Sequence, residues 1–312
     1  MAIRPNQLRQ FQLFLRRLAA GASDHHERLT MNPPKKAHAD LEGKVAIITG
    51  AGSRASGIGN GRAAAILLIE AGMRVAIVDS VDENMSETRD LMEKAGGEWL
   101  SFTADVSVAE QCEHVVAAVA ESWGGVDVLF NNVGIVGPSS SVVDVDLNDW
   151  DRCFDINVTS MVLMSRFSIP HMRSGGGGSI INASSIVGVL GAHPSIIYST
   201  TKGAVTNLTR AMAAMHGPEG IRVNALVPGF MHTPMVYAQG LSEEDRIRRR
   251  NVSPLGRGGV EGNGWDVGAA VRFLASDDAR FITGVNMPVD GGLTAVIPMS
   301  ETMSITAPVD GR

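Results

Sequence analysis

The chain has little cysteine, few aromatic residues, no excess of basic charge and no long apolar run. Among its 312 residues, only Cys112 and Cys153 are cysteines, and they have neither CxxC spacing nor an HExxH companion. We therefore expect no disulfide framework, no structural zinc site and no other bound metal. Thiols without such a pattern are typical of a reducing compartment, so a cytoplasmic location is expected first.

The charge balance and the apolar runs exclude two further classes of protein. Lys and Arg total 27, Asp and Glu total 33, and the formal charge is −6. A nucleic-acid binder needs a basic face to neutralise phosphates, so no nucleic-acid partner is expected. The longest apolar run, residues 63–69, ends at Glu70. Because a bilayer-spanning helix needs roughly 20 apolar residues, no membrane span is expected.

The first 40 residues differ in composition from the rest. Residues 1–21 contain four arginines and no acidic residue, and their Leu and Phe side chains recur at helical spacing. This pattern is typical of a mitochondrial targeting segment. The alternatives are a frayed surface helix, or a start codon placed ahead of a true first residue at Met31. Prolines and lysines at 33–36 indicate a linker, so we predict an N-terminal extension over residues 1–40.

From residue 41 onward, short apolar runs alternate with longer segments of helical periodicity. The runs VAIIT and VAIVD are almost continuously apolar, as strands buried on both faces of a parallel sheet are. The predicted strands are residues 44–49, 74–79, 98–104, 127–131, 179–183, 221–227 and 285–289, and the predicted helices between them include 59–71, 108–122 and 148–169. Right-handed crossovers then favour a single α/β domain, a doubly wound Rossmann sheet with helices on both faces.

A glycine-rich turn joins the first predicted strand to the helix that follows it. Its backbone amides and the positive end of the helix dipole can approach a pyrophosphate. The turn residues expected to do so are Gly50, Gly57, Ile58 and Gly59. Asp79 ends the second strand, where a carboxylate accepts hydrogen bonds from the adenosine ribose hydroxyls and repels a 2′-phosphate. Arg54, in the turn, favours that phosphate instead, and on balance we predict NAD rather than NADP.

Tyr198 and Lys202 form the pattern Tyr-x-x-x-Lys in a predicted helix over 198–216, so they share a face one turn apart. The ordinary pKa of tyrosine is near 10, and a neighbouring ammonium group lowers that pKa by stabilising the phenolate. Tyr198 is therefore predicted to act as general acid–base on an alcohol or ketone oxygen. Ser185 follows the fifth predicted strand, at the ligand-binding edge of the sheet, where its hydroxyl can bond the same oxygen. His193, between them, either lines the substrate site or is an exposed loop residue.

Together these motifs resemble the compact subfamily of the short-chain dehydrogenases/reductases, over residues 41–294. The resemblance rests on the glycine turn 49–59, Asp-Val at 105–106, Asn-Asn-Val-Gly at 131–134, Asn157, Ser185, Tyr198, Lys202, Pro-Gly at 228–229, Thr233 and Val-Asp-Gly-Gly at 289–292. It implies a seven-stranded sheet. It also implies a lid over the substrate at residues 235–264, a C-terminal tail at 295–312, and assembly into a homodimer or homotetramer.

The resemblance implies a role for each site residue. Ser185 would orient the substrate, Tyr198 would move the proton, Lys202 would hold the nicotinamide ribose and tune the tyrosine, and Asn157 would hold a water that relays the proton. Besides the glycine turn and Asp79, the implied cofactor contacts are Asp105 near the adenine, Val106, Asn132, Gly134, Tyr198 and Lys202, with Pro228, Gly229 and Thr233 near the nicotinamide.

The chain departs from the family pattern in its glycine turn. The family has three residues between Thr-Gly and Gly-Ile-Gly, whereas this chain has six, residues 51–56. We therefore expect a wider loop whose phosphate contacts differ from the usual ones. A second departure is Val133, which stands where alanine is commoner and is expected to narrow the cofactor channel.

The leading hypothesis is an NAD-dependent dehydrogenase that interconverts a secondary alcohol and a ketone, with a small molecule as its substrate. One alternative is an NADPH-dependent ketone reductase, including a 3-oxoacyl-carrier-protein reductase. Another, from a different class, is a catalytically idle subunit that binds NAD and signals through a partner.

Overall fold

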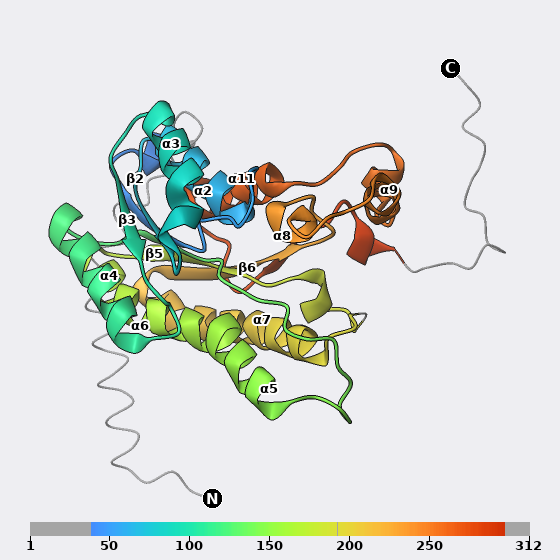
Figure 1. Ribbon diagram of the computed structural model, residues 1–312. Coiled ribbons are helices and arrows are strands. Elements are labelled where there is room, and N and C mark those ends of the chain that lie inside the picture. Colours follow the sequence, from blue (N-terminus) through green and yellow to red (C-terminus); the bar gives the residue numbers. More distant parts are fainter. Residues whose placement is uncertain (1–38, 192, 297–312) are drawn as a thin grey trace, which may run out of the picture. The chain divides into compact units, whose positions relative to one another are not determined.

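The structure is a computed structural model that describes residues 39–191 and 193–296. The expectations for a targeting segment, for the linker at 33–36 and for most of the tail concern residues outside this range. Within it, seven parallel strands form one sheet in the order β3-β2-β1-β4-β5-β6-β7 (Figure 1). The strands are β1 Val45–Thr49, β2 Arg74–Asp79, β3 Trp99–Thr103, β4 Val128–Asn131, β5 Gly178–Ala183, β6 Ile221–Pro228 and β7 Asn286–Val289. The predicted doubly wound α/β fold is confirmed.

The sheet lies between two layers of helices (Figure 1). Strand β1 is buried at all five positions because alternate side chains enter opposite layers: Ala46 and Ile48 join one core, and Val45 and Ile47 join the other. On the first face pack α2 Asn60–Glu70, α3 Ser86–Ala95 and α11 Gly264–Ala275; on the second pack α4 Ala109–Trp123, α6 Ser160–Ser174 and α7 Ile196–His216. This two-sided burial explains why the strand sequences are apolar without alternation.

One predicted helix is divided in the structure. The segment 148–169 was expected to be continuous, but α5 Leu147–Phe154 passes into a π-helical turn at Asp155–Thr159 before α6 begins. Helix α6 also continues past the expected end, through Pro170 to Ser174. The prediction of a single α-helix was wrong. The π-helical turn is a single turn between two α-helices, and the apolar residues on each side of it keep their helical spacing, so the sequence pattern does not show the break.

The segment between β6 and α11 contains the short helices α8 Pro234–Tyr237, α9 Glu243–Arg250 and α10 Pro254–Arg257. Helix α9 has the sequence EEDRIRRR and buries none of its residues. Not all of its charges face solvent, because Arg246 pairs with Glu261 and Arg249 lies over the Phe230 ring. Across residues 39–191 and 193–296, no helix has the length and apolarity that a membrane span needs.

Candidate functional site

The predicted site residues gather at the carboxyl edge of the sheet, where parallel strands all end on the same side. Strand β1 ends at Thr49, directly before the glycine turn, and β2 ends at Asp79. Strand β5 ends at Ala183, two residues before Ser185. Segments far apart in the sequence are thus brought to one place.

The glycine turn leads into α2, which begins without a side-chain cap. Of the turn amides expected to meet a phosphate, the N–H of Gly50 donates to the Val78 carbonyl and the N–H of Gly57 donates to Glu87, so the start of the helix is the part that remains open. Gly50 has a φ of +65°, a conformation that other residues rarely adopt. The N-cap of α2 is Gly59, which has no side chain to bond the amides of the first turn. A side chain at Gly61 would collide with the carbonyl oxygen of Gly50, so the helix packs directly against the turn. The helix start can therefore accept an anion such as a phosphate.

Asp79 faces this turn and organises it. One carboxylate oxygen, Oδ2, accepts from the backbone N–H of Gly52 at 3.1 Å, and Oδ1 accepts from the backbone N–H of Val81 at 3.2 Å. Oδ1 also accepts from Asn84 Nδ2 at 3.5 Å. A carboxylate has about four acceptor positions, so about one remains for a ribose hydroxyl. Arg54 lies exposed in the same loop.

The turns after β3 and β4 complete this part of the edge. Asp105 follows β3, and its carboxylate accepts from the backbone N–H and the hydroxyl of Ser107; Val106 beside it is buried in the core. Asn132 follows β4 and donates from Nδ2 to the carbonyl oxygen of Gly50 at 2.9 Å. Asn132 therefore ties the end of β4 to the glycine turn.

Lys202 is buried next to Tyr198. Its Nζ donates to the carbonyl oxygen of Ala183 at 2.8 Å and lies 5.8 Å from the centre of the Tyr198 ring. A Cβ at Gly134 would lie 3.0 Å from Lys202 Nζ and 3.4 Å from Asn157 Oδ1. Gly134 is thus the residue that leaves room for the lysine. Burial lowers the pKa of Lys202 to about 8.

Asn157 lies in the π-helical turn and is fully buried. Its Oδ1 accepts from the backbone N–H of Ile135 at 2.7 Å, while its Nδ2 donates to the Ile135 carbonyl at 2.8 Å and to Thr201 Oγ1 at 3.0 Å. The side chain therefore links the loop after β4 to helix α7. The turn widens the helix at the point where this side chain must reach inward.

The phenol of Tyr198 is the one site group whose acidity differs from the expectation. Burial raises the pKa of Tyr198, and a hydrogen bond with Ser185 opposes that rise without cancelling it. The net change is therefore a rise in the pKa of Tyr198 and not the expected lowering, because desolvation of the phenol outweighs the interactions that favour the phenolate. Ser185 itself follows β5 and accepts from the backbone N–H of Val187 at 3.4 Å.

The segment after β6 brings Pro228, Gly229 and Thr233 to the same edge. A Cβ at Gly229 would lie 2.8 Å from Asp290 Cα, so the glycine allows this turn to pack against the turn after β7. Thr233 is the N-cap of α8, is buried, and makes no side-chain cap hydrogen bond. Its hydroxyl is therefore available to a ligand.

His193 is half-buried and packs against the tyrosine, with ring centres 5.1 Å apart. Its Nδ1 accepts from the backbone N–H of Ser195 at 3.0 Å, which leaves Nε2 as the protonated nitrogen of the neutral ring. The histidine also lines a cavity of about 480 Å³ together with Ser140, Ser141, Val142, Gly191, Pro194, Ile196 and Ser199. His193 is therefore a neighbour of the Tyr198 ring and not a fully exposed loop residue.

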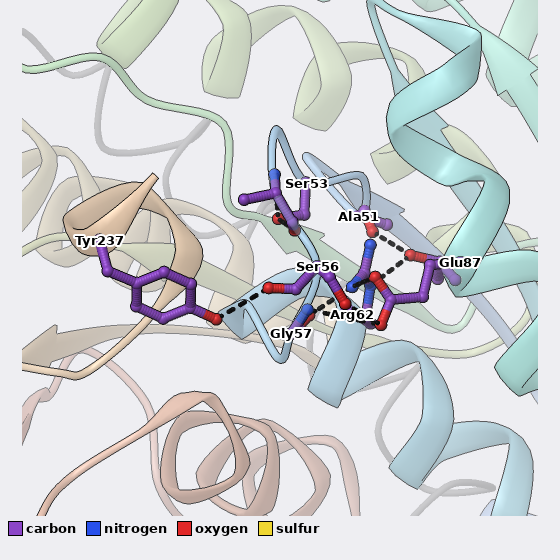
Figure 2. A network of polar contacts seen from close by, with 9 residues as sticks. Ala51, Ser53, Ser56, Gly57, Arg62, Glu87 and Tyr237 are labelled. Atoms are coloured by element: carbon purple, nitrogen blue, oxygen red, sulfur yellow. Dashed lines mark hydrogen bonds and ion pairs between the residues drawn. The ribbon is translucent and has the colours of Figure 1, made fainter. Parts of the chain in front are cut away.

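Four residues of this edge lie outside the sequence prediction: Arg62, Glu87, Thr201 and Tyr237. Arg62, which is buried, forms an ion pair with the partly exposed Glu87 beside the glycine turn, and Thr201 bonds Asn157. Tyr237 reaches the same turn from α8 (Figure 2). Of these four residues, only Tyr237 could have been singled out from the sequence, because it is the second of the chain's two tyrosines.

Comparison with known proteins agrees with this arrangement. Residues 52–294 match the family described as enoyl-(acyl carrier protein) reductase. The cis-4-hydroxycyclohexanecarboxylate dehydrogenase of Sinomonas cyclohexanicum is 38% identical over 81% of this chain and 97% of its own length. The meso-2,3-butanediol dehydrogenase of Serratia marcescens is 37% identical over 82% and 96%. Carveol dehydrogenase from Mycobacterium avium, solved in complex with NAD, superposes with a TM-score of 0.76 at 30% identity, covering 82% of this chain and 99% of that one.

The fold, the site and these relatives define an oxidoreductase with a nicotinamide cofactor. The chain belongs to the short-chain dehydrogenase/reductase family.

Proposed function

We propose that the chain interconverts secondary alcohols and ketones, with NAD rather than NADP as its cofactor and with Asn157, Ser185, Tyr198 and Lys202 as its catalytic set. The observation that carries the proposal is the buried Lys202 ammonium beside the Tyr198 ring, at the sheet edge that also bears the glycine turn. The relatives that oxidise a hydroxycyclohexane acid and butanediol support the same chemistry.

The residues at this edge fit a nicotinamide dinucleotide. The uncapped start of α2 offers amides to the phosphates, Asp79 has spare acceptor capacity for a ribose, and the Thr233 hydroxyl makes no cap bond. When bound, the cofactor supplies the acceptor for the hydride that the alcohol carbon loses.

The chain's own groups handle the proton. During alcohol oxidation the Tyr198 phenolate takes the proton of the substrate hydroxyl, and during ketone reduction the phenol returns it. Ser185 holds the substrate oxygen beside the phenol, and Lys202 stabilises the phenolate by its charge. Asn157 fixes the loop that carries Gly134 against Lys202, which keeps the ammonium in place.

The direct test is turnover with a panel of alcohols. Purified protein is mixed with NAD and a panel of cyclic and aliphatic secondary alcohols. Some of these alcohols carry a second oxygen atom that could reach His193. Turnover should produce the absorbance of reduced nicotinamide. The same panel with NADP, and ketones with NADPH, tests the reductase alternative. Cofactor binding without turnover of any alcohol or ketone would favour the idle subunit and contradict the proposal.

The choice of NAD is tested at Asp79. Charge-assisted hydrogen bonds contribute about 1.5–3 kcal/mol each, so Asp79→Ala should raise the KM for NAD about tenfold to a hundredfold. The KM for NADP should stay the same or fall, because the repulsion of the 2′-phosphate is lost. Initial rates with each cofactor give both values.

A matched variant separates charge from loop structure. Asp79→Asn keeps an oxygen that can accept from the Gly52 N–H but has no charge. It should shift preference towards NADP while the thermal unfolding midpoint stays near that of the unmodified chain. An unchanged preference in both variants would show that Asp79 does not choose the cofactor.

A further inference from the structure

The extended glycine loop is supported by an ion pair between the buried Arg62 and the partly exposed Glu87. Arg62, on α2, is 1% exposed and pairs through NH1 with Glu87 Oε2 of α3 at 2.6 Å. The same nitrogen donates to the carbonyl oxygen of Gly57. Glu87 Oε1 accepts from the Ser56 hydroxyl at 3.2 Å and from the Gly57 N–H at 3.4 Å. These bonds fix the end of the loop that enters α2 (Figure 2).

The beginning of the loop is tied to the same arginine. Arg62 Nε donates to Thr88 Oγ1 at 2.9 Å, and Thr88 Oγ1 donates to the carbonyl oxygen of Ala51 at 2.8 Å. A buried charge without partners is costly, so Arg62 strongly favours the conformation in which Glu87, Thr88 and Gly57 surround it. The six-residue loop is therefore anchored at both ends.

The end of the loop that enters α2 also has a contact with a more distant segment, helix α8. Tyr237, the last residue of α8, donates from its hydroxyl to the carbonyl oxygen of Ser56 at 3.0 Å. A side chain at Gly57 would collide with this hydroxyl, and Gly57 has a φ of +119°. Because only glycine fits there, Tyr237 lies directly against the loop (Figure 2).

Tyr237 also lies on the same short segment as Thr233, one of the proposed cofactor contacts. Thr233 begins α8 and Tyr237 ends it. A cofactor that contacts the start of α2 on one side and Thr233 on the other passes beside the segment that joins them. The Tyr237–Ser56 hydrogen bond therefore connects the two walls of the proposed cofactor site.

We propose that Tyr237 is a positioning residue that latches α8 to the extended glycine loop and slows the release of the bound dinucleotide. The anchored loop supplies one partner of this hydrogen bond, and α8 supplies the other. This inference rests on the proposed function only in that the chain must bind a nicotinamide dinucleotide.

The test is the rate of NADH release, followed by stopped-flow fluorescence after mixing the enzyme–NADH complex with excess NAD. Tyr237→Phe removes one hydroxyl and keeps the ring. A neutral hydrogen bond contributes about 0.5–1.5 kcal/mol, so the release rate should rise about 2- to 13-fold while the association rate stays unchanged. The thermal unfolding midpoint verifies that the variant is folded.

Ser242→Ala is the matched control, because Ser242 also lies on the lid but bonds only within α9. Its NADH release rate should equal that of the unmodified chain. Equal release rates in Tyr237→Phe and the unmodified chain would overturn the latch, as would an equal rise in both variants. If the unmodified chain binds no NADH, the proposed function itself fails.

Discussion

Replacing Tyr198 by phenylalanine is expected to lower kcat by about 10²- to 10⁴-fold, the usual contribution of a general acid–base. The variant loses only the hydroxyl that exchanges a proton with the substrate, so its affinity for NADH should stay within about twofold of the original. The measurements are initial rates with the best alcohol of the panel and fluorescence titration with NADH. Retention of more than a tenth of the turnover would contradict the assigned role.

Thr200→Ala is the control for Tyr198→Phe. Thr200 lies on the same helix, is exposed, and donates from its hydroxyl to the carbonyl oxygen of Ile196. Removal of this hydroxyl should leave kcat unchanged. A comparable loss in both variants would mean that the start of α7 is sensitive to any change, and the proton transfer would then need another donor.

The acidity of Tyr198 also predicts the pH dependence of each direction. Burial raises the pKa of Tyr198, so the neutral phenol that ketone reduction needs is the main form at neutral pH. Alcohol oxidation needs the phenolate, and its rate should increase from pH 7 into the alkaline range. In Ser185→Ala, which removes a group that lowers this pKa, the increase should move to higher pH.

The sheet was predictable because its strands are buried on both faces. Residues 44–49 and 74–79 were expected as strands, and β1 and β2 match them to within one residue at each end. Local composition decides such strands, since a parallel sheet covered by helices leaves no polar face. The placement of Tyr198 and Lys202 on one face of a helix was also predictable, because it depends only on helical geometry.

Contacts between distant segments were not predictable. The π-helical turn that contains Asn157 depends on Ile135 and Thr201, which lie 22 and 44 residues away in the chain. Arg62 looked like one polar residue in a predicted helix, yet it is buried against Glu87. The spacing of residues along the sequence does not predict such a pair, because the pair forms only when α2 and α3 pack side by side.

Replacing Lys202 by methionine is expected to lower kcat by about 10²- to 10³-fold, the usual effect of removing one group that stabilises developing charge. Methionine is unbranched and fits the space beside Gly134 and the Tyr198 ring, but it leaves the phenolate without a nearby cation. Lys94→Met, at an exposed position of α3, should keep full turnover. Comparable activity in the Lys202 and Lys94 variants would contradict an electrostatic role for Lys202.

Whereas Lys202→Met is expected to lower activity, it is expected to raise stability, by an amount that depends on pH. Burial lowers the pKa of Lys202 from 10.5 in the unfolded chain to about 8 in the folded one. Between these values the unfolded chain binds a proton that the folded chain does not, so the stability of the unmodified chain relative to Lys202→Met rises with pH. The gain in stability between pH 8 and pH 10.5 should be at most about 3 kcal/mol, measured by urea unfolding of both proteins at each pH.

Below pH 8 the full cost of burying the Lys202 ammonium remains. A stability difference that stays constant across the range would mean that Lys202 is not desolvated. The lysine thus reduces stability at neutral pH in return for the charge that the phenolate requires, which is the stability–activity trade-off expected of a site residue.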